Sequence, residues 1–352
     1  MGRLQRGSWD RGGGCLLRLL VGVGCALGAL ACTPREQTDG PPRSDLSGSL
    51  RAAGEPTVRA AGSAAAAAPP PSQSASTPRS ASGPLTIGVT LHPYFSWTKN
   101  IVGDSPGVEV RAILPGDVDA GSYQPRPDDI QKLMDLDAIV VNSIGHDDFI
   151  PAMVNASGNK NLTLIRPNDG TPTLRAARGG AVNSHTFISF TNAIQQTYAI
   201  EKALSALRPD LADRFHEGAA DYARKLRQVK ASAAVKLADA KVTRVVTVHD
   251  GYSYLCQELG IEVAGVIEPA HGLVPSAAEL GDMVDLLRRE KIQVILSEES
   301  FPAKLLQALK QDTGARVYVI SHIASGEYTA GKFEKEMQQN ADVLIKALVT
   351  DR

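Results

Sequence analysis

The chain of 352 residues has few of the features that mark several large functional classes. Aromatic residues make up only 5% of it and the formal net charge is −1, so the composition indicates neither a stacking platform nor a basic surface for nucleic acid. The sequence contains no Cys-x-x-Cys and no His-Glu-x-x-His. It also has no Gly-x-Ser-x-Gly leading from a strand into a helix. These absences argue against a structural zinc module, a zincin and a serine hydrolase.

The first residues have the pattern of an export signal. Basic residues between positions 3 and 11 precede an apolar run from Leu16 to Ala31, which is too short to span a membrane. The run ends in Ala29-Leu-Ala-Cys32, which resembles a bacterial lipobox. We therefore expect a signal peptide over residues 1–31, lipidation of Cys32, and a location on the periplasmic side of a bacterial membrane, lipid-anchored. Ordinary cleavage that leaves a thiol at Cys32 is the alternative.

The four cysteines do not provide a disulfide within the mature chain. Two of them, Cys15 and Cys25, leave with the signal peptide, and acylation of Cys32 would leave Cys256 alone. Residues 32–84 are rich in Ala, Pro and Ser and cannot bury enough apolar surface to offset their ordering entropy. They are expected to form a disordered linker that follows the lipidated cysteine.

From Leu85 onward, short apolar strands alternate with helical segments, first to about residue 200 and again from residue 241. This alternation indicates βαβ units and an α/β fold of two parallel-sheet lobes. Between them, apolar positions recur at helical spacing to about Ala240, which predicts a long connecting helix. The expected domains are an N-terminal lobe (85–200), the connecting helix (201–240) and a C-terminal lobe (241–352), with the ligand in the cleft between the lobes.

Histidines concentrate where the predicted strands end. Six of the seven lie at the carboxyl end of a strand or in the loop that follows it: His92, His146, His185, His249, His271 and His322. Ligands of open α/β sheets bind at this edge. Ser184 is a candidate N-cap, which would place His185 in the first turn of a helix. There the helix dipole disfavours a protonated ring, and a neutral imidazole is the form that binds metal.

A ligand set of several imidazoles and one carboxylate suits zinc, which takes four ligands from His, Cys and Asp or Glu. Glu268, Glu298 and Glu299 each follow a predicted strand and could supply that carboxylate. Glu298 and Glu299 are expected to line the cleft and to orient an imidazole by hydrogen bonding. A site dominated by histidine favours zinc over manganese, which prefers more oxygen ligands.

Several motifs resemble those of the metal-specific substrate-binding proteins of bacterial ABC importers, which bind zinc or manganese. In chain order they are Leu114-Pro-Gly-Asp117, Ser122-Tyr-Gln-Pro-Arg-Pro-Asp-Asp-Ile130, Asp137-Ala-Ile-Val-Val-Asn-Ser-Ile-Gly145, Asn183-Ser-His185, Val248-His-Asp-Gly-Tyr-Ser-Tyr-Leu255 and Pro275-Ser-Ala-Ala-Glu-Leu280. The resemblance covers residues 85–349. It implies two α/β lobes, a rigid connecting helix, a buried metal ion between the lobes, and delivery of that ion to a membrane permease.

The resemblance also implies which residues bind the metal in the first lobe. His185 matches the histidine of the family's Asn-Pro-His motif. The family's first ligand lies in an Asp-Pro-His-x-Tyr-Glu-Pro motif, which reads Asp119-Ala-Gly-Ser-Tyr-Gln-Pro125 here, with Gly121 at the ligand position. We therefore expect His92 and His146, on neighbouring loops of the same lobe, to replace that ligand.

In the second lobe, the resemblance implies ligands from two loops. Glu268 and His271 match one of them, and His322 lies close to the position of the other. His249 matches a histidine that many members carry without using it as a ligand, so a structural role is expected. The family's histidine-rich acidic loop is missing.

The leading hypothesis is thus an extracytoplasmic solute-binding protein that is monomeric, is not an enzyme, and delivers zinc, or alternatively manganese, to an ABC importer permease. A binder of an organic solute or metal chelate is an alternative because Gly121 replaces a family ligand. A zinc hydrolase with Glu268 or Glu299 as general base is a further alternative, which needs an open coordination position.

Overall fold

The computed structural model describes residues 84–177, 180–268 and 273–350. The predicted signal peptide, the lipidation site at Cys32 and the linker up to residue 83 lie outside the described residues. So does His271, one of the predicted ligands. Among the helices of the described residues, none combines the length and the apolar character that crossing a membrane requires.

The first half of the fold is built on a parallel four-stranded sheet with the order β2-β1-β3-β4. Its strands are β1 (Leu85–Val89), β2 (Val108–Ala112), β3 (Ala138–Val140) and β4 (Thr163–Ile165). Ala138, Ile139 and Val140 are all completely buried, as expected for a central strand that is covered on both faces. The helices of this half are α1 (His92–Val102), α2 (Pro127–Gln131) and α3 (Ile150–Ser157).

The second half repeats this plan with a parallel sheet in the order β6-β5-β7-β8. Its strands are β5 (Arg244–Thr247), β6 (Glu262–Val266), β7 (Val294–Ser297) and β8 (Arg316–Val319). Its helices are α6 (Ser253–Glu258), α7 (Ala277–Arg289) and α8 (Ala303–Thr313). A capping box starts α7: Ser276 Oγ accepts from the backbone N–H of Glu279, and the Glu279 carboxylate accepts from that of Ser276. The predicted fold class, two parallel-sheet α/β lobes, is confirmed.

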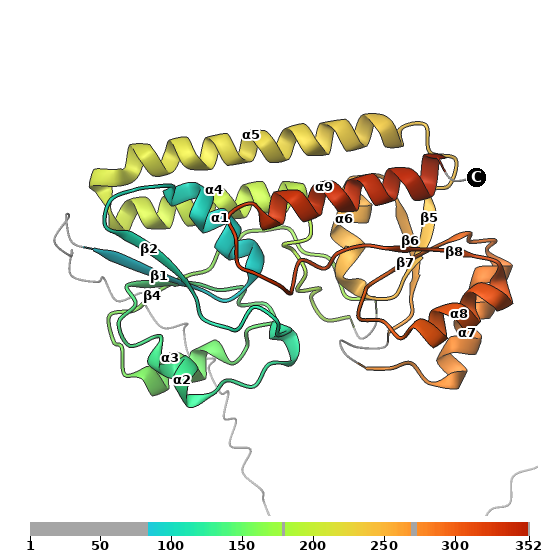
Figure 1. Ribbon diagram of the computed structural model, residues 1–352, viewed down its shortest axis with the longest axis horizontal. Helices are drawn as coiled ribbons and strands as arrows, with labels where there is room; N and C mark the ends of the chain where they lie inside the picture. Colours follow the sequence, from blue (N-terminus) through green and yellow to red (C-terminus); the bar gives the residue numbers. More distant parts are fainter. Residues whose placement is uncertain (1–83, 178–179, 269–272, 351–352) are drawn as a thin grey trace, which may run out of the picture. The chain divides into compact units, whose positions relative to one another are not determined.

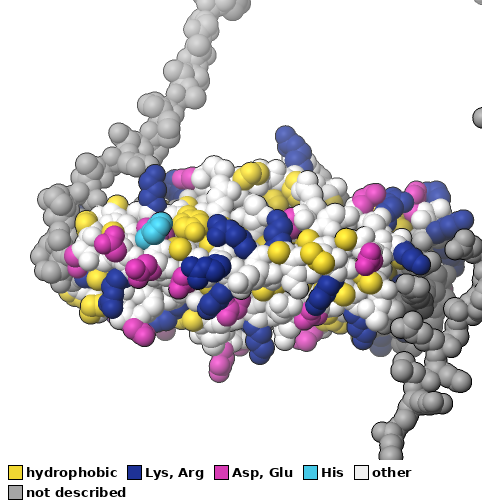
Figure 2. Space-filling model, turned by 90° about the horizontal axis from the view of Figure 1, so that it is seen from above, with side chains coloured by type: hydrophobic (Ala, Val, Ile, Leu, Met, Phe, Trp, Pro, Cys, Tyr) yellow, Lys and Arg dark blue, Asp and Glu magenta, His cyan; other side chains and the backbone are white. Residues whose placement is uncertain are grey.

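Long helices lie along both sheets and form one layer (Figure 1). They are α4 (Phe190–Leu207), α5 (Ala212–Leu237) and α9 (Lys332–Ile345). Pro209 separates α4 from α5, and α5 continues for 26 residues with its apolar stripe turned inward. Viewed from the helix side, the surface carries acidic and basic side chains interspersed with apolar ones (Figure 2).

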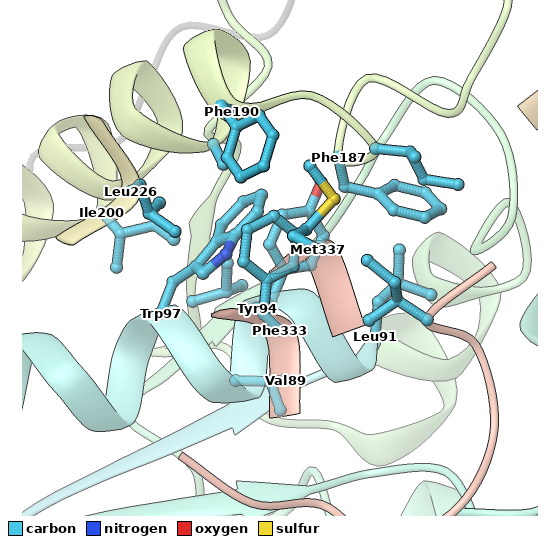
Figure 3. Packing of buried hydrophobic residues seen from close by; sticks show 14 of the residues in the cluster. Val89, Leu91, Tyr94, Trp97, Phe187, Phe190, Ile200, Leu226, Phe333 and Met337 are labelled. Carbon is cyan, nitrogen blue, oxygen red and sulfur yellow. The ribbon is translucent and has the colours of Figure 1, made fainter. Parts of the chain in front are cut away.

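The main core lies between this helical layer and the sheets. Trp97 on α1 meets Tyr94 and Phe333 edge-to-face, with ring centroids 5.2 and 5.1 Å apart. Figure 3 shows these rings together with Phe190 and Met337. The same buried cluster includes side chains of the second sheet, such as Leu296. Both halves of the fold therefore contribute to this core, while a second buried cluster, which includes Val246, Met283 and Ile295, belongs to the second half alone.

Candidate metal centre

His185 lies in the loop between β4 and α4 and not in a helix, which corrects the sequence-based expectation. The first turn of α4 begins at Phe190, and its N-cap is Ser189, whose Oγ accepts from the N–H of Asn192 at 3.1 Å. Ser184 is not the N-cap, so His185 does not lie in the first turn of α4, where the helix dipole would act on its ring. The ring is instead oriented by Asn183, whose Oδ1 accepts from the backbone N–H of His185 at 3.0 Å and from Nδ1 at 2.8 Å. Nδ1 is therefore the donor nitrogen, and Nε2 carries the lone pair.

His249 follows β5 and meets His185 from the other half of the fold. The Nε2 atoms of the two buried rings are 2.8 Å apart. Nδ1 of His249 lies 3.4 Å from Oε2 of Glu268, so the carboxylate directs the lone pair of His249 toward Nε2 as well. A contact of this length between two ring nitrogens is either a hydrogen bond from one ring to the other or a pair of lone pairs directed at a shared metal ion.

His322, in the loop after β8, completes a group of three. One ligand nitrogen from each of His185, His249 and His322 lies within 4.8 Å of the others, and this is the group in the described residues that could hold a metal ion. Around a tetrahedral zinc ion, ligand nitrogens are about 3.3 Å apart, so shifts of about an ångström would bring all three into its shell. Gly251 makes room for this packing, because a Cβ there would lie 3.0 Å from Nε2 of His322.

His146, in the loop after β3, adds a fourth imidazole. Its ring centroid is 4.4 Å from that of His185 and 6.2 Å from that of His322. The residue has a φ of 65°, an uncommon conformation for a side chain with a Cβ. We name these four residues, His146, His185, His249 and His322, the histidine cluster.

The loop that holds His146 is fixed by buried polar groups. The Asp147 carboxylate accepts from the backbone N–H groups of Asn142 and Ser143 and from the hydroxyl of Thr90, at 2.6 to 2.9 Å. Burial raises the pKa of Asp147 in spite of these bonds. Asn142 Nδ2 donates to the carbonyl of Ser184 at 3.1 Å, which ties the loop to the residue before His185.

His92 is near the cluster but is engaged elsewhere. Its Nε2 lies 2.9 Å from the carbonyl oxygen of Gly326, and its ring stacks on Tyr328 at a centroid distance of 3.9 Å. Burial lowers the pKa of His92, so the neutral ring is favoured. His92 lines a cavity of about 20 Å³ together with His146 and His322. Asp119 and Ala120, from the loop in which Gly121 replaces the family's ligand, line it too.

The remaining predicted residues lie outside the cluster. The carboxylate of Glu268 lies beside Nδ1 of His249 and not beside Nε2, which is the nitrogen that faces His185. Glu298 accepts a hydrogen bond from the hydroxyl of Tyr252 at 2.9 Å. Glu299 is exposed. His249, expected to be structural, is part of the group instead. Its position directly after a predicted strand was the sequence signal for this.

Comparison with known proteins shows which family the chain belongs to. A family model described as zinc-uptake complex component A, periplasmic, matches residues 87–347. The zinc-binding lipoprotein AdcA of Streptococcus pneumoniae is 25% identical over 268 residues, which cover 72% of this chain and 52% of AdcA. This chain thus spans about half the length of that relative. The high-affinity zinc uptake system protein ZnuA of Bacillus subtilis is 22% identical over 296 residues, covering 78% of this chain and 92% of ZnuA.

Solved structures include more similar proteins. The substrate-binding protein FpvC of Pseudomonas aeruginosa, in complex with Ni²⁺, is 39% identical with a TM-score of 0.70, covering 75% of this chain and 97% of FpvC. FpvC in complex with Mn²⁺ is 40% identical, with the same TM-score and 75% and 98% coverage. The family match includes all the loops that carry the histidine cluster. The chain therefore belongs to the family of periplasmic component A proteins of zinc-uptake complexes.

Proposed function

We propose that this protein captures a divalent transition metal ion, zinc first of all, outside the cytoplasm and delivers it to the permease of an ABC importer. The observation that carries the proposal is the meeting of His185 with His249 and His322, which come from loops of different sheets. An ion bound there is held by both halves of the fold, as capture and later release require. Membership of a family of uptake-complex components agrees with the expectation that the chain is not an enzyme.

The proposed ligands are the four imidazoles of the histidine cluster, with Glu268 as the carboxylate that orients His249. Four nitrogen ligands favour zinc over manganese, which is better served by oxygen. Manganese remains the alternative cargo. The FpvC complexes with Ni²⁺ and Mn²⁺ indicate that related sites accept more than one metal ion.

We further propose that the mature protein is a monomer that is lipid-anchored through Cys32 and faces the periplasm. The support is the signal-like start of the sequence, the lipobox-like Ala29-Leu-Ala-Cys32, and the family's description as periplasmic. Mass spectrometry of the protein from a bacterial membrane tests the anchor, since acylation adds the mass of the lipid to a chain that begins at Cys32.

Calorimetry of the full chain with Zn²⁺ tests the metal site. We expect one zinc ion per chain, and we expect the His185→Ala and His249→Ala substitutions each to lower the affinity at least about 100-fold, because a ligand is lost. His216→Ala is the matched control, since His216 is an exposed histidine on α5. Zinc binding that is unchanged in both cluster variants would contradict the proposal.

An organic solute or metal chelate is the second candidate, and a groove in the second half favours it. The groove has a volume of about 790 Å³ and runs between residues 174–177 and strand β6, with Asp250 next to His249 in its wall. This is the size of a small-molecule site. Native mass spectrometry of the purified protein distinguishes the two, because a bound organic molecule would add several hundred daltons and a zinc ion alone would not.

A further inference from the structure

After His322 the chain crosses from the second half of the fold to the first. Residues 323–330, which we name the strap, run from the end of β8 to the start of α9 beside α1 (Figure 1). Gly326 donates its N–H to the carbonyl of Gly116 at 2.7 Å, and Ser96 donates its hydroxyl to the carbonyl of Thr329 at 2.8 Å. The strap is therefore bound to α1 and to the loop after β2.

His92 holds the middle of the strap in two ways. Its Nε2 donates to the carbonyl of Gly326 at 2.9 Å, and its ring lies parallel to that of Tyr328, with an interplanar angle of 3°. Phe95, one turn later on α1, also contacts Tyr328, with centroids 5.4 Å apart. His92 is thus the residue of the first half that makes both a polar and an aromatic contact with the strap.

The strap forms one wall of the metal centre. The cavity of about 20 Å³ beside the histidine cluster is lined by His146 and His322 and, from the strap, by Ile323, Ala324 and Tyr328. This volume holds about one water molecule, so side chains nearly fill the space between the strap and the histidine cluster.

The strap has a fixed base and a strained first residue. Asn340 on α9 holds Ser321 through both its backbone N–H and its carbonyl, at 2.7 and 2.8 Å. Ile323, two residues later, has a φ of 59°, which is costly for a β-branched side chain. Strain at this point is relieved if the backbone rotates, so Ile323 is placed to act as the pivot.

We propose that residues 323–330 are the gate through which the metal ion enters and leaves the histidine cluster. We further propose that His92 is a positioning residue that latches this gate and not a ligand of the ion. The inference rests on the proposed function. It assigns the rate of metal exchange to contacts that lie outside the coordination shell.

Release of Zn²⁺ from the full chain to a chromogenic chelator, followed by stopped-flow, tests the gate. Three variants loosen the strap in different ways. Tyr328→Ala removes the stacking partner, and His92→Phe retains a ring but loses the hydrogen bond. Gly116→Ala would place a Cβ 2.3 Å from the carbonyl oxygen of Gly326 and push the strap away. Tyr328→Phe, which keeps the ring, is the matched control.

Each of the three variants should release zinc about tenfold faster than the wild type, since each weakens the seating of the strap on the first half. Tyr328→Phe should match the wild type. The visible spectrum of the Co²⁺ form should be the same in all variants, because the ligands are unchanged. Unchanged release rates in Tyr328→Ala and Gly116→Ala would overturn the gate.

A Co²⁺ spectrum that changes in His92→Phe alone would overturn the latch, because it would make His92 a ligand. These failures differ from failure of the proposed function, in which the wild-type chain would bind no stoichiometric zinc. Thermal melting of each variant identifies any variant that does not fold. If the variants of His92 or Tyr328 do not fold, Gly116→Ala still tests the gate, because it alters neither His92 nor the histidine cluster.

Discussion

Nε2 of His185 lies 2.8 Å from Nε2 of His249, although the two residues follow strands of different sheets. The second nitrogen of each ring is already engaged, in His185 by Asn183 and in His249 by Glu268. The orientation of both rings is therefore set before any ion arrives. Capture of the ion then requires little ordering of side chains, and this favours high affinity.

Replacing Glu268 by Gln should weaken zinc binding. The carboxylate lies 3.4 Å from Nδ1 of His249 and stabilises the tautomer with its lone pair on Nε2. Loss of such a partner typically costs about 10- to 100-fold in metal affinity. Calorimetry with a competing chelator measures this change. Glu299→Gln, which changes an exposed carboxylate on the loop after β7, serves as the control and should bind zinc like the wild type. Equal affinities of the two variants would show that Glu268 does not orient His249.

Gly145→Ala should destabilise the fold and weaken metal binding together. Gly145 has a φ of 121°, and a Cβ there would lie 2.7 Å from Cβ of Ser184, so the loops of His146 and His185 would be forced apart. We expect a loss of about 1 to 3 kcal/mol in the free energy of unfolding, measured by urea denaturation.

Gly281→Ala is the matched control for this substitution. Gly281 lies within α7 with open space around the position of its Cβ, so alanine should raise the free energy of unfolding by about 0.5 to 1 kcal/mol. Zinc affinity should stay at the wild-type value. If both glycine variants changed stability in the same direction, the close approach at Gly145 would not matter.

Glu258→Ala should lower stability by about 2 to 4 kcal/mol. From α6 of the second half, this carboxylate accepts from the backbone N–H groups of Phe190 and Thr191 at 2.6 and 3.0 Å and lies 3.2 Å from Nζ of Lys230. Without it, the first turn of α4 loses two acceptors in a nearly buried place. Chemical denaturation measures the loss, and Glu217→Ala on the exposed side of α5 should change stability by less than about 0.5 kcal/mol. A similarly small effect at both positions would contradict the role of Glu258.

Gln196→Met should stabilise the protein. Gln196 on α4 is completely buried, and within the described part of the chain its amide nitrogen and oxygen have no hydrogen-bond partner. Methionine has a similar shape and removes the cost of burying these two polar atoms, a gain of about 1 to 2 kcal/mol. Differential scanning calorimetry should show a higher melting temperature, whereas the exposed Gln228→Met should have no effect. A lower melting temperature would indicate that the amide is hydrogen-bonded after all.

The fold was predictable because its signals are local. The apolar strands and the helical spacing that continues to about Ala240 each depend on residues within a few positions of one another. The start of α4 was not predictable in this way. Ser184 and Ser189 are both plausible N-caps, and the choice is made by Glu258, which lies 68 residues after Phe190 and caps the helix from another element.

The candidate site was predictable in its residue type but not in its membership. Placement at strand ends identified His146, His185 and His322. His249 was assigned a structural role from the resemblance alone. β5 is a central strand of its sheet, so the loop after it comes to the middle of the carboxyl edge, where it meets the first half. Strand order within a sheet depends on long-range pairing, and a single sequence does not display it.

The core shared by the two halves has a consequence for how the protein unfolds. Ile87 of the first sheet and Leu296 of the second belong to one buried cluster beneath the same helices. If the helices separated from one sheet, they would also expose the apolar side chains of the other sheet. The two halves should therefore melt in a single cooperative transition, and a fragment cut between them would be prone to aggregate.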